Sequence, residues 1–166
     1  MQNNFYLIAH NIRSLYNVGS FFRTADAFGV KKIFLTGYTG TPKNFRLEKT
    51  ALGAEKLVAW EYRNRLKPVL DKLKQDGVRI VALENNVPLS LTLPREGGGK
   101  IFMTLNKFKP KFPLALLLGE EVAGIKKPYL KMCDNIVEIP MQGKKESLNV
   151  AVAAGIAMYH ISQNSK

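Results

Sequence analysis

Three short segments of the sequence combine glycine, amide and charged side chains in ways that suit ligand binding. The first, residues 11–29, reads NIRSLYNVGSFFRTADAFG. Asn17 is suited to cap a helix there, because its side chain can accept a hydrogen bond from a free amide of the first turn. Gly19 permits close backbone approach, and Arg23 lies one turn further on, where its planar guanidinium can clamp a phosphate. A surface pair between Arg23 and Asp26 explains the same residues without any function.

The second segment, residues 114–125, reads LALLLGEEVAGI. It predicts a buried strand that ends at Gly119 and is followed at once by Glu120 and Glu121. Ligands of open α/β sheets gather beyond the carboxyl ends of strands. The two adjacent glutamates point in different directions, so they do not form a catalytic pair of the glycosidase type. An acidic helix start, favoured by the helix macrodipole, is the alternative interpretation.

The third segment, residues 136–149, reads IVEIPMQGKKESLN and leads from a predicted strand into the last helix, which begins at Ser147 or Asn149. Pro140 removes one backbone donor, while the neighbouring amides stay free to bind a small molecule. Ser147 needs no function, because a serine is a good helix cap. Asn149 stands in the first turn of a wholly apolar helix, and its amide needs a partner from the protein or from a ligand.

The charge of the chain indicates a polyanionic partner. Its 25 Lys and Arg against 13 Asp and Glu give a net charge of +12, which attracts nucleic acid or, as the rival, an anionic membrane. The lysines at 107, 109 and 111 interleave with two phenylalanines and two prolines. They predict an extended basic loop, which either contacts phosphates or serves as a solvated connector.

Other site classes are not indicated. No GxGxxG follows a strand, so a Rossmann dinucleotide site is not expected. The GGGK at residues 97–100 lacks the Walker spacing and the hydroxyl residue after lysine. His10 and His160 are too few and too isolated for a zinc site, so we expect no metal.

The length, 166 residues, suits one domain, and we expect residues 1–166 to form it. The single cysteine, Cys133, cannot form an intrachain disulfide, which fits a reducing cytoplasm. No apolar run is long enough to span a membrane, and the first residues do not resemble a signal peptide. We therefore expect a cytoplasmic protein.

The pattern of apolar runs predicts an α/β fold with a parallel sheet flanked by helices. Most of the predicted strands are continuously apolar, as in a sheet covered on both faces. They occupy residues 5–9, 32–36, 57–62, 79–83, 114–118 and 136–139. Helices are predicted at 17–28, ending at Gly29, at 66–74, ending at Gly77, and after Pro128.

The last predicted helix, residues 147–161, reads SLNVAVAAGIAMYHI and has almost no polar face. A helix that is apolar all round must be buried all round, which a terminal helix of a small domain cannot easily achieve alone. Its small residues also permit close approach of another helix. We expect a symmetric homodimer through this helix, with a central helix in a monomer's core as the alternative.

Together and in this order, the three segments resemble the signature motifs of the SPOUT superfamily, in its SpoU/TrmH branch of RNA methyltransferases. The third, IPMQGKKESLNVAVA, is the most specific, and the resemblance covers essentially the whole chain, including the GAE at residues 53–55. It implies a parallel sheet with a deep C-terminal trefoil knot, a homodimer, and S-adenosylmethionine as methyl donor. It also implies methylation of a ribose 2′-hydroxyl in tRNA or rRNA.

The resemblance also implies roles for individual residues. The cofactor would be held by Gly119, Ile139, Met141 and Leu148. The polar active-site positions would be Asn17, Arg23, Glu121, Ser147 and Asn149. Arg23 is expected to matter most for catalysis, by fixing a phosphate rather than by accepting the proton, since guanidinium barely deprotonates in proteins.

The sequence departs from the family pattern in two ways. It has GEE where an amide often precedes the glutamate, which leaves open whether Glu120 or Glu121 matters. Many relatives carry an extra RNA-binding domain, which this chain is expected to lack, so its own basic surface would grip RNA through Lys43, Arg46, Lys49, Lys107, Lys109 and Lys111. A non-catalytic RNA-binding protein and a base methyltransferase remain as alternatives.

Overall fold

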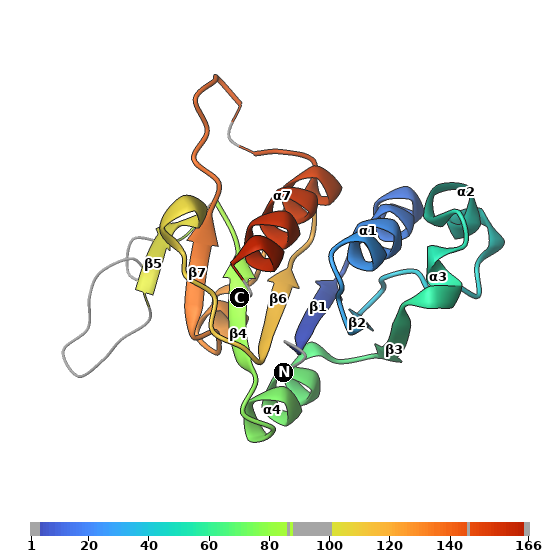
Figure 1. Cartoon of the computed structure of the whole chain (residues 1–166), viewed down its shortest axis with the longest axis horizontal. Coiled ribbons are helices and arrows are strands. Elements are labelled where there is room, and N and C mark those ends of the chain that lie inside the picture. Colours follow the sequence, from blue (N-terminus) through green and yellow to red (C-terminus); the bar gives the residue numbers. More distant parts are fainter. Residues whose placement is uncertain (1–3, 86, 88–100, 146, 165–166) are drawn as a thin grey trace.

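The computed structural model of the chain describes residues 4–85, 87, 101–145 and 147–164. These residues form a seven-stranded sheet in the order β3-β2-β1-β6-β4-β7-β5, with every neighbouring pair parallel (Figure 1). The strands are β1 (Phe5–His10), β2 (Lys32–Thr36), β3 (Ala59–Arg63), β4 (Arg79–Leu83), β5 (Ile101–Thr104), β6 (Leu114–Leu118) and β7 (Asn135–Glu138).

The predicted parallel sheet is confirmed, and the differences have local causes. Residues 57–62 were predicted as one strand, but Leu57 ends a short helix and the strand β3 begins two residues later. β5 was not predicted, because its four residues IFMT are too short a run to show a periodicity of their own.

Helices cover both faces of the sheet. The α-helices are α1 (Leu15–Ala27), α2 (Glu48–Ala51), α3 (Ala54–Leu57), α4 (Leu66–Gln75), α6 (Lys127–Leu130) and α7 (Val150–Gln163), with 3-10 turns η1 (Phe45–Leu47) and η2 (Leu105–Lys107). α1 and α7 lie side by side on one face, and α4 lies on the other (Figure 1). No helix in the described ranges is both long and apolar enough to cross a membrane.

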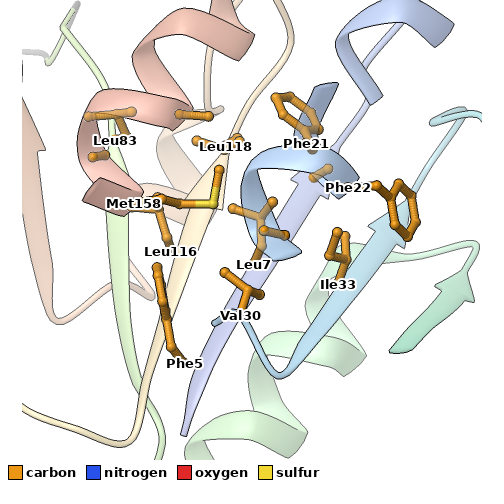
Figure 2. Close-up of a cluster of buried hydrophobic side chains, with 14 of the residues drawn as sticks. Phe5, Leu7, Phe21, Phe22, Val30, Ile33, Leu83, Leu116, Leu118 and Met158 are labelled. Carbon is orange, nitrogen blue, oxygen red and sulfur yellow. The ribbon is translucent and has the colours of Figure 1, made fainter. Parts of the chain in front are cut away.

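Alternate residues of the central strands enter two separate cores. Leu7 of β1 and Leu116 of β6 lie in the core beneath α1 and α7 (Figure 2), whereas Ile8 and Leu117 lie in the core beneath α4. Because successive side chains of a strand point to opposite faces, a strand between two helical layers must be apolar throughout. This arrangement explains the continuous apolar runs in the sequence.

The cap of α1 differs from the predicted one, and the cap of α7 is the second of the two residues that the sequence offers. Ser14, not Asn17, caps α1, and its Oγ accepts a hydrogen bond from the Asn17 amide at 3.3 Å. Asn149, not Ser147, caps α7, and its Oδ1 accepts from the amides of Ala151 at 2.8 Å and Val152 at 3.3 Å. The cap at Ser14 leaves the Asn17 side chain free to bind a distant segment. The acidic helix start at Glu120 is also wrong, since a turn closed by the bridge between Glu120 and Gly124 lies there.

A helical glycine sets the contact between α1 and the segment that carries α2. A Cβ atom at Gly19 would lie 2.0 Å from Oγ1 of Thr50 and 2.8 Å from the carbonyl oxygen of Leu47. The threonine side chain can rotate, but the backbone carbonyl cannot easily withdraw. The close approach therefore requires glycine at this position.

We expect Gly19→Ala to lower the free energy of unfolding by about 1–3 kcal/mol through overpacking. Gly155→Ala is the matched control, because a Cβ there would meet only Cγ2 of Thr24 at an ordinary 3.8 Å. Alanine favours the helix over glycine, so this control is expected to gain roughly 0.5–1 kcal/mol. Urea denaturation at one protein concentration measures both changes, and a loss of equal size in the two variants would contradict the packing argument.

Candidate functional site

A cavity of about 120 Å³ opens beyond the carboxyl ends of β4 and β6. β6, β4 and β7 are neighbours in the sheet, so the segments that follow these strands meet at one edge. The start of α7 forms another wall of the cavity. The lining residues are Leu83, Glu84, Asn85, Leu118, Gly119, Glu120, Glu121, Val122, Ala123, Gly124, Ile139, Ser147, Leu148, Val150 and Ala153.

The turn after β6 is tight because two glycines allow it. A Cβ at Gly119 would lie 2.6 Å from the carbonyl carbon of Gly124, so no larger residue fits between the two arms of the turn. Gly124 itself has a φ of +63° and packs against the Glu84 carboxylate. That carboxylate accepts a hydrogen bond from the Ile125 amide at 2.7 Å, which ties the turn to the end of β4.

The wall after β7 is held by a reciprocal pair of hydrogen bonds. Nδ2 of Asn85 donates to the Ile139 carbonyl at 2.9 Å, and the Ile139 amide donates to Oδ1 of Asn85 at 3.1 Å. The sequence reasoning missed Glu84 and Asn85. The signal was present, because both directly follow a buried strand, as Glu120 and Glu121 do.

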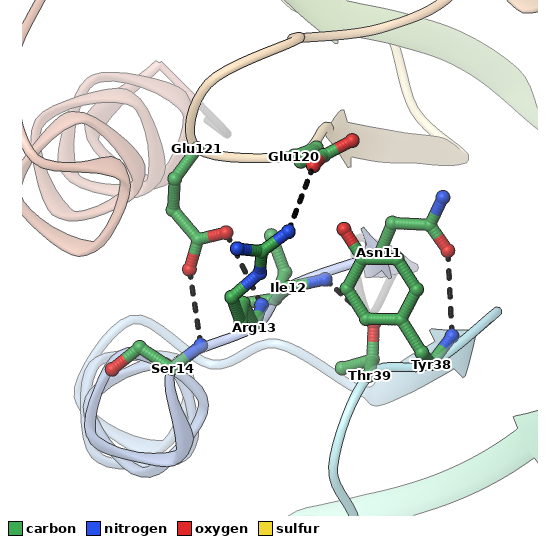
Figure 3. Close-up of polar contacts among 8 residues, drawn as sticks. All are labelled: Asn11, Ile12, Arg13, Ser14, Tyr38, Thr39, Glu120 and Glu121. Carbon is green, nitrogen blue, oxygen red and sulfur yellow. Dashed lines mark hydrogen bonds and ion pairs between the residues drawn. The ribbon is translucent and has the colours of Figure 1, made fainter.

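Glu121 joins the second motif to the first. Its carboxylate accepts hydrogen bonds from the amides of Arg13 at 3.1 Å and Ser14 at 3.2 Å (Figure 3). It also accepts one from Nδ2 of Asn17 at 3.1 Å. It thereby satisfies amide groups at the start of α1, where a negative charge is favourable. Glu120 instead forms a looser ion pair with Arg13 at 3.7 Å.

Asn17 extends this connection to the third motif. Its Oδ1 accepts a hydrogen bond from Nδ2 of Asn149 at 3.2 Å, while Asn149 also caps α7. The partner that a polar amide at the start of this helix requires is therefore a protein side chain, Asn17. One chain of hydrogen bonds, here called the Glu121–Asn17–Asn149 network, links all three motifs.

The same hydrogen bonds set the ionisation of Glu121. Partial burial raises the pKa of its carboxyl, but the donors from Arg13, Ser14 and Asn17 outweigh burial, so the pKa lies below its ordinary value. Glu121 is consequently a carboxylate at neutral pH and accepts hydrogen bonds without donating a proton.

The structure brings together most, but not all, of the residues that the sequence singles out. Gly119, Glu121, Ser147, Leu148 and Ile139 line the cavity, and Asn17 and Asn149 lie beside it. Met141 is not among the lining residues. Arg23 is exposed on the outer face of α1, and no described residue forms a hydrogen bond or ion pair with it.

The six basic residues predicted to bind RNA form two separate groups. Lys43, Arg46 and Lys49 are exposed in the segment after β2, on the same edge of the sheet as the cavity. Lys107, Lys109 and Lys111 line another hollow together with Arg79, Leu114 and Asn135, the first residues of β4, β6 and β7. The second group therefore faces the amino ends of these strands.

The cavity differs in charge from the chain as a whole. The described residues that line it include three carboxylates, from Glu84, Glu120 and Glu121, and neither lysine nor arginine. Apolar walls from leucine, isoleucine and valine complete it. Such a lining suits a small ligand with an apolar body and a positive centre, and disfavours a polyphosphate. Within the described residues, no group of three or more His, Cys, Asp or Glu could hold a metal ion.

The fold and the cavity define a parallel α/β domain with a cavity at the carboxyl edge of its sheet. The sequence model of the SpoU rRNA Methylase family matches residues 4–159. The chain belongs to this family, which confirms the resemblance seen in its motifs.

Relatives in this family include proteins that modify rRNA. The chain is 32% identical over 153 residues to the 23S rRNA (guanosine-2′-O-)-methyltransferase RlmB of Nitrosomonas europaea, covering 92% of this chain and 54% of that protein. It is 33% identical over 147 residues to the 23S rRNA (guanosine(2553)-2′-O)-methyltransferase RlmP of Bacillus subtilis, covering 87% and 52%. The chain thus spans about half the length of these relatives.

The fold is also found in solved structures. A TrmH/SpoU tRNA modifying enzyme from A. aeolicus superposes with a TM-score of 0.80 at 25% identity, covering 98% of this chain and 76% of that one. An AdoMet-bound rRNA methyltransferase from Sinorhizobium meliloti has a TM-score of 0.79 at 24% identity, covering 96% and 56%. The second likeness concerns the fold alone.

We expect the stabilisation by Glu121 to depend on pH in the acid range. Because the pKa of its carboxyl is lowered in the folded protein, the stabilisation is complete above the ordinary value of 4.5 and is lost as the pH falls through the lowered pKa. The free energy of unfolding of the wild type should therefore exceed that of Glu121→Gln at neutral pH, and the difference should shrink in acid.

Urea denaturation of both proteins from neutral pH to about pH 3 measures this difference. Glu48→Gln is the matched control for loss of one negative charge, since Glu48 is exposed on α2 and outside the network. A difference that stayed constant down to the most acid pH would show that the charge of Glu121 does not stabilise the fold.

Proposed function

We propose that this chain is an S-adenosylmethionine-dependent methyltransferase that modifies RNA at a ribose 2′-hydroxyl. The observation that carries the proposal is the Glu121–Asn17–Asn149 network. It joins the three family motifs, which are far apart in the sequence, around one cavity. The names of the relatives point to the same reaction.

The residues around the cavity fit S-adenosylmethionine. Apolar walls from Ile139 and Leu148 suit its adenosine and carbon chain, and the anionic lining suits a sulfonium and an ammonium group. Gly119, which tolerates no side chain, keeps backbone groups of the turn at the cavity wall. Met141 follows Pro140 on the same loop, and we propose that it contacts the cofactor although it does not line the cavity.

The residues of this chain have positioning roles in the proposed reaction. When bound, the cofactor supplies a methyl group on a positively charged sulfur to an RNA oxygen. The network fixes the start of α1 against the cavity, so Glu121 acts through the backbone rather than on the substrate. Ser147 lies on the cavity wall, where its hydroxyl can meet the RNA. Holding both reactants in line is a large part of such catalysis.

We assign to Arg23 the binding of a phosphate next to the target ribose. A guanidinium keeps its proton in proteins, so it orients and stabilises rather than acts as a base, and the hydroxyl proton passes to phosphate or water. Arg23 does not line the cavity of its own chain. The assignment is therefore coupled to a second proposal, the dimer.

We propose a homodimer in which α7 packs against the partner. In the single chain, α7 buries Ala154, Ala157, Met158 and Ile161 against the sheet. Its outer face leaves Val152 53%, Ile156 42% and Tyr159 55% exposed, although all three are large and apolar or aromatic. A second copy would cover this face. The outer face of α1, which carries Arg23, lies beside it and would meet the partner's cavity.

The basic groups support RNA as substrate, and we place the protein in the cytoplasm, where RNA and cofactor are both present. Lys43, Arg46 and Lys49 lie on the edge of the sheet that holds the cavity, so they are the first choice for phosphate contacts. Such contacts position RNA but do not read its sequence. We also propose that the chain forms the C-terminal trefoil knot that the family resemblance implies.

Methyl transfer from labelled cofactor to total tRNA and to ribosomal RNA tests the reaction. We expect 2′-O-methylated nucleosides after digestion and mass spectrometry, whereas a methylated base would favour base methylation. Arg23→Ala should lower transfer by about a hundredfold, because the ribose is no longer held in line. Its calorimetric affinity for S-adenosylmethionine should not change.

Arg65→Ala is the matched control, since Arg65 is an exposed arginine at the start of α4, on the other face of the sheet. Full activity in Arg23→Ala would remove the role assigned to it. Cofactor binding without transfer to any RNA would favour the non-catalytic RNA-binding protein, and absence of cofactor binding would overturn the proposed function.

We expect Ile156→Asp to convert the dimer into a monomer, because a carboxylate in an apolar interface loses its hydration without gaining a partner. Light scattering after gel filtration measures the mass. Leu57→Asp is the control, since Leu57 is 72% exposed on α3, away from α7. A wild-type protein that is monomeric at micromolar concentration would contradict the dimer.

A further inference from the structure

A shallow hollow of about 570 Å³ lies beyond the ends of β2 and β3, on the same edge of the sheet as the cofactor cavity. We call it the aromatic hollow. Its lining residues are Gly37, Tyr38, Thr39, Gly40, Thr41, Lys43, Asn44, Phe45 and Tyr62. None of its aromatic residues belongs to the family motifs or to the Glu121–Asn17–Asn149 network.

The hollow concentrates exposed aromatic rings. Phe45 is 70% exposed, Tyr38 51% and Tyr62 41%. They are three of the five most exposed large aromatic residues in the described part of the chain, and the other two, Tyr16 and Tyr159, lie on helices. Scattered exposed apolar residues are ordinary, but rings gathered around one hollow mark a binding surface.

The frame that carries these rings is held by hydrogen bonds. The Tyr62 hydroxyl donates to the Gly37 carbonyl at 2.8 Å, and the Tyr38 amide donates to Oδ1 of Asn11 at 3.3 Å (Figure 3). Gly37 has a φ of +66°, and a Cβ there would lie 1.8 Å from the Asn11 side chain. Since the Tyr62 ring and the backbone at Tyr38 are already held, a ligand does not have to order them on binding.

Tyr38 connects the hollow to the site of methyl transfer. Its hydroxyl faces Glu120 and Arg13, and both influence its pKa, which is raised by loss of hydration and by the Glu120 carboxylate. The amide of Arg13 in turn binds Glu121. The aromatic hollow and the cofactor cavity are therefore neighbours that share one polar rim.

The charges around the hollow are those that bind phosphate. Lys43 lines it, and Arg46 directly follows Phe45 and is exposed. A duplex can be bound by lysine and arginine alone, through its phosphates, because its bases are stacked on one another and cannot stack on the protein. Exposed rings interleaved with cations serve unpaired nucleotides, whose bases are free to stack on the protein.

We infer that the aromatic hollow binds an unpaired nucleotide that neighbours the methylated one, by stacking its base on Phe45 and Tyr38 while Lys43 and Arg46 contact the backbone. The inference rests on the proposed function in its choice of RNA. It narrows the substrate to a loop or single-stranded segment, because a helix cannot present a free base to these rings.

The test compares two fluorescein-labelled RNA probes at one salt concentration: a hairpin with an unpaired loop of mixed sequence and a blunt duplex of equal length. By fluorescence anisotropy, Phe45→Ala should bind the hairpin about five- to a hundredfold more weakly than the wild type, as expected for loss of one stacked base. Its affinity for the duplex should not change. Phe45→Trp, which keeps a stacking surface, should restore hairpin binding.

Leu57→Ala is the control for loss of an exposed apolar side chain outside the hollow, and it should bind both probes like the wild type. A 2-aminopurine in the loop should be quenched by the wild type and less by Phe45→Ala. Equal weakening for both probes, or no weakening, would overturn the inference and leave the rings to a protein partner.

These measurements require neither cofactor nor methyl transfer. If the protein binds S-adenosylmethionine and methylates RNA while Phe45→Ala binds the hairpin normally, the stacking site alone is wrong. If Phe45→Ala loses hairpin binding while no methyl transfer occurs, the stacking site stands and the proposed enzyme activity falls.

Discussion

The carboxylate of Glu121 is the group on which the site depends. It reaches from the turn after β6 to the start of α1, and its acceptors satisfy amide groups about a hundred residues away in sequence. A charged acceptor at a helix start is favoured by free amides and by the helix dipole together. Asn17 is hydrogen-bonded to both Glu121 and Asn149. The positions of the loop after β6, the first turn of α1 and the cap of α7 therefore depend on one another.

The distribution of charge separates the two ligands of the proposed reaction. The chain carries a net charge of +12, yet the described lining of the cavity holds carboxylates and no cation. A cationic methyl donor is attracted to the cavity and an RNA backbone is repelled from it, while the lysines and arginines outside draw the RNA to the rim. In the proposed reaction, attraction over the surface and repulsion from the cavity would leave the ribose at the boundary between them, next to the methyl donor.

The sequence is sufficient to predict the fold class, because short apolar runs that alternate with helices indicate strands buried on both faces. Six of the seven described strands overlap the predicted runs. The sequence also identifies Gly119, the adjacent pair Glu120 and Glu121, and Asn149 as unusual. It cannot choose between Glu120 and Glu121, since that choice depends on which carboxylate faces the start of α1. It misplaces the cap of α1, because Ser14 and Asn17 are equally good caps by residue type and only the long-range bond to Glu121 decides between them. The ring of Phe45 cannot be singled out from the sequence, since Tyr62, which lines the same hollow, comes from another segment.

Among the described residues, none forms a hydrogen bond or ion pair with Arg23, and the outer face of α7 exposes large apolar side chains. The positions of the two features relate them. The two helices pack side by side, so a surface that covers Ile156 also approaches the outer face of α1. In the proposed dimer, a second copy of the chain would meet both needs at once, as a symmetric interface places the same helix pair on each side. A monomeric enzyme would have to leave an apolar helix face in water and an arginine of its first motif far from its own cavity. One proposed interface therefore explains both observations, whereas a monomer would need a separate explanation for each.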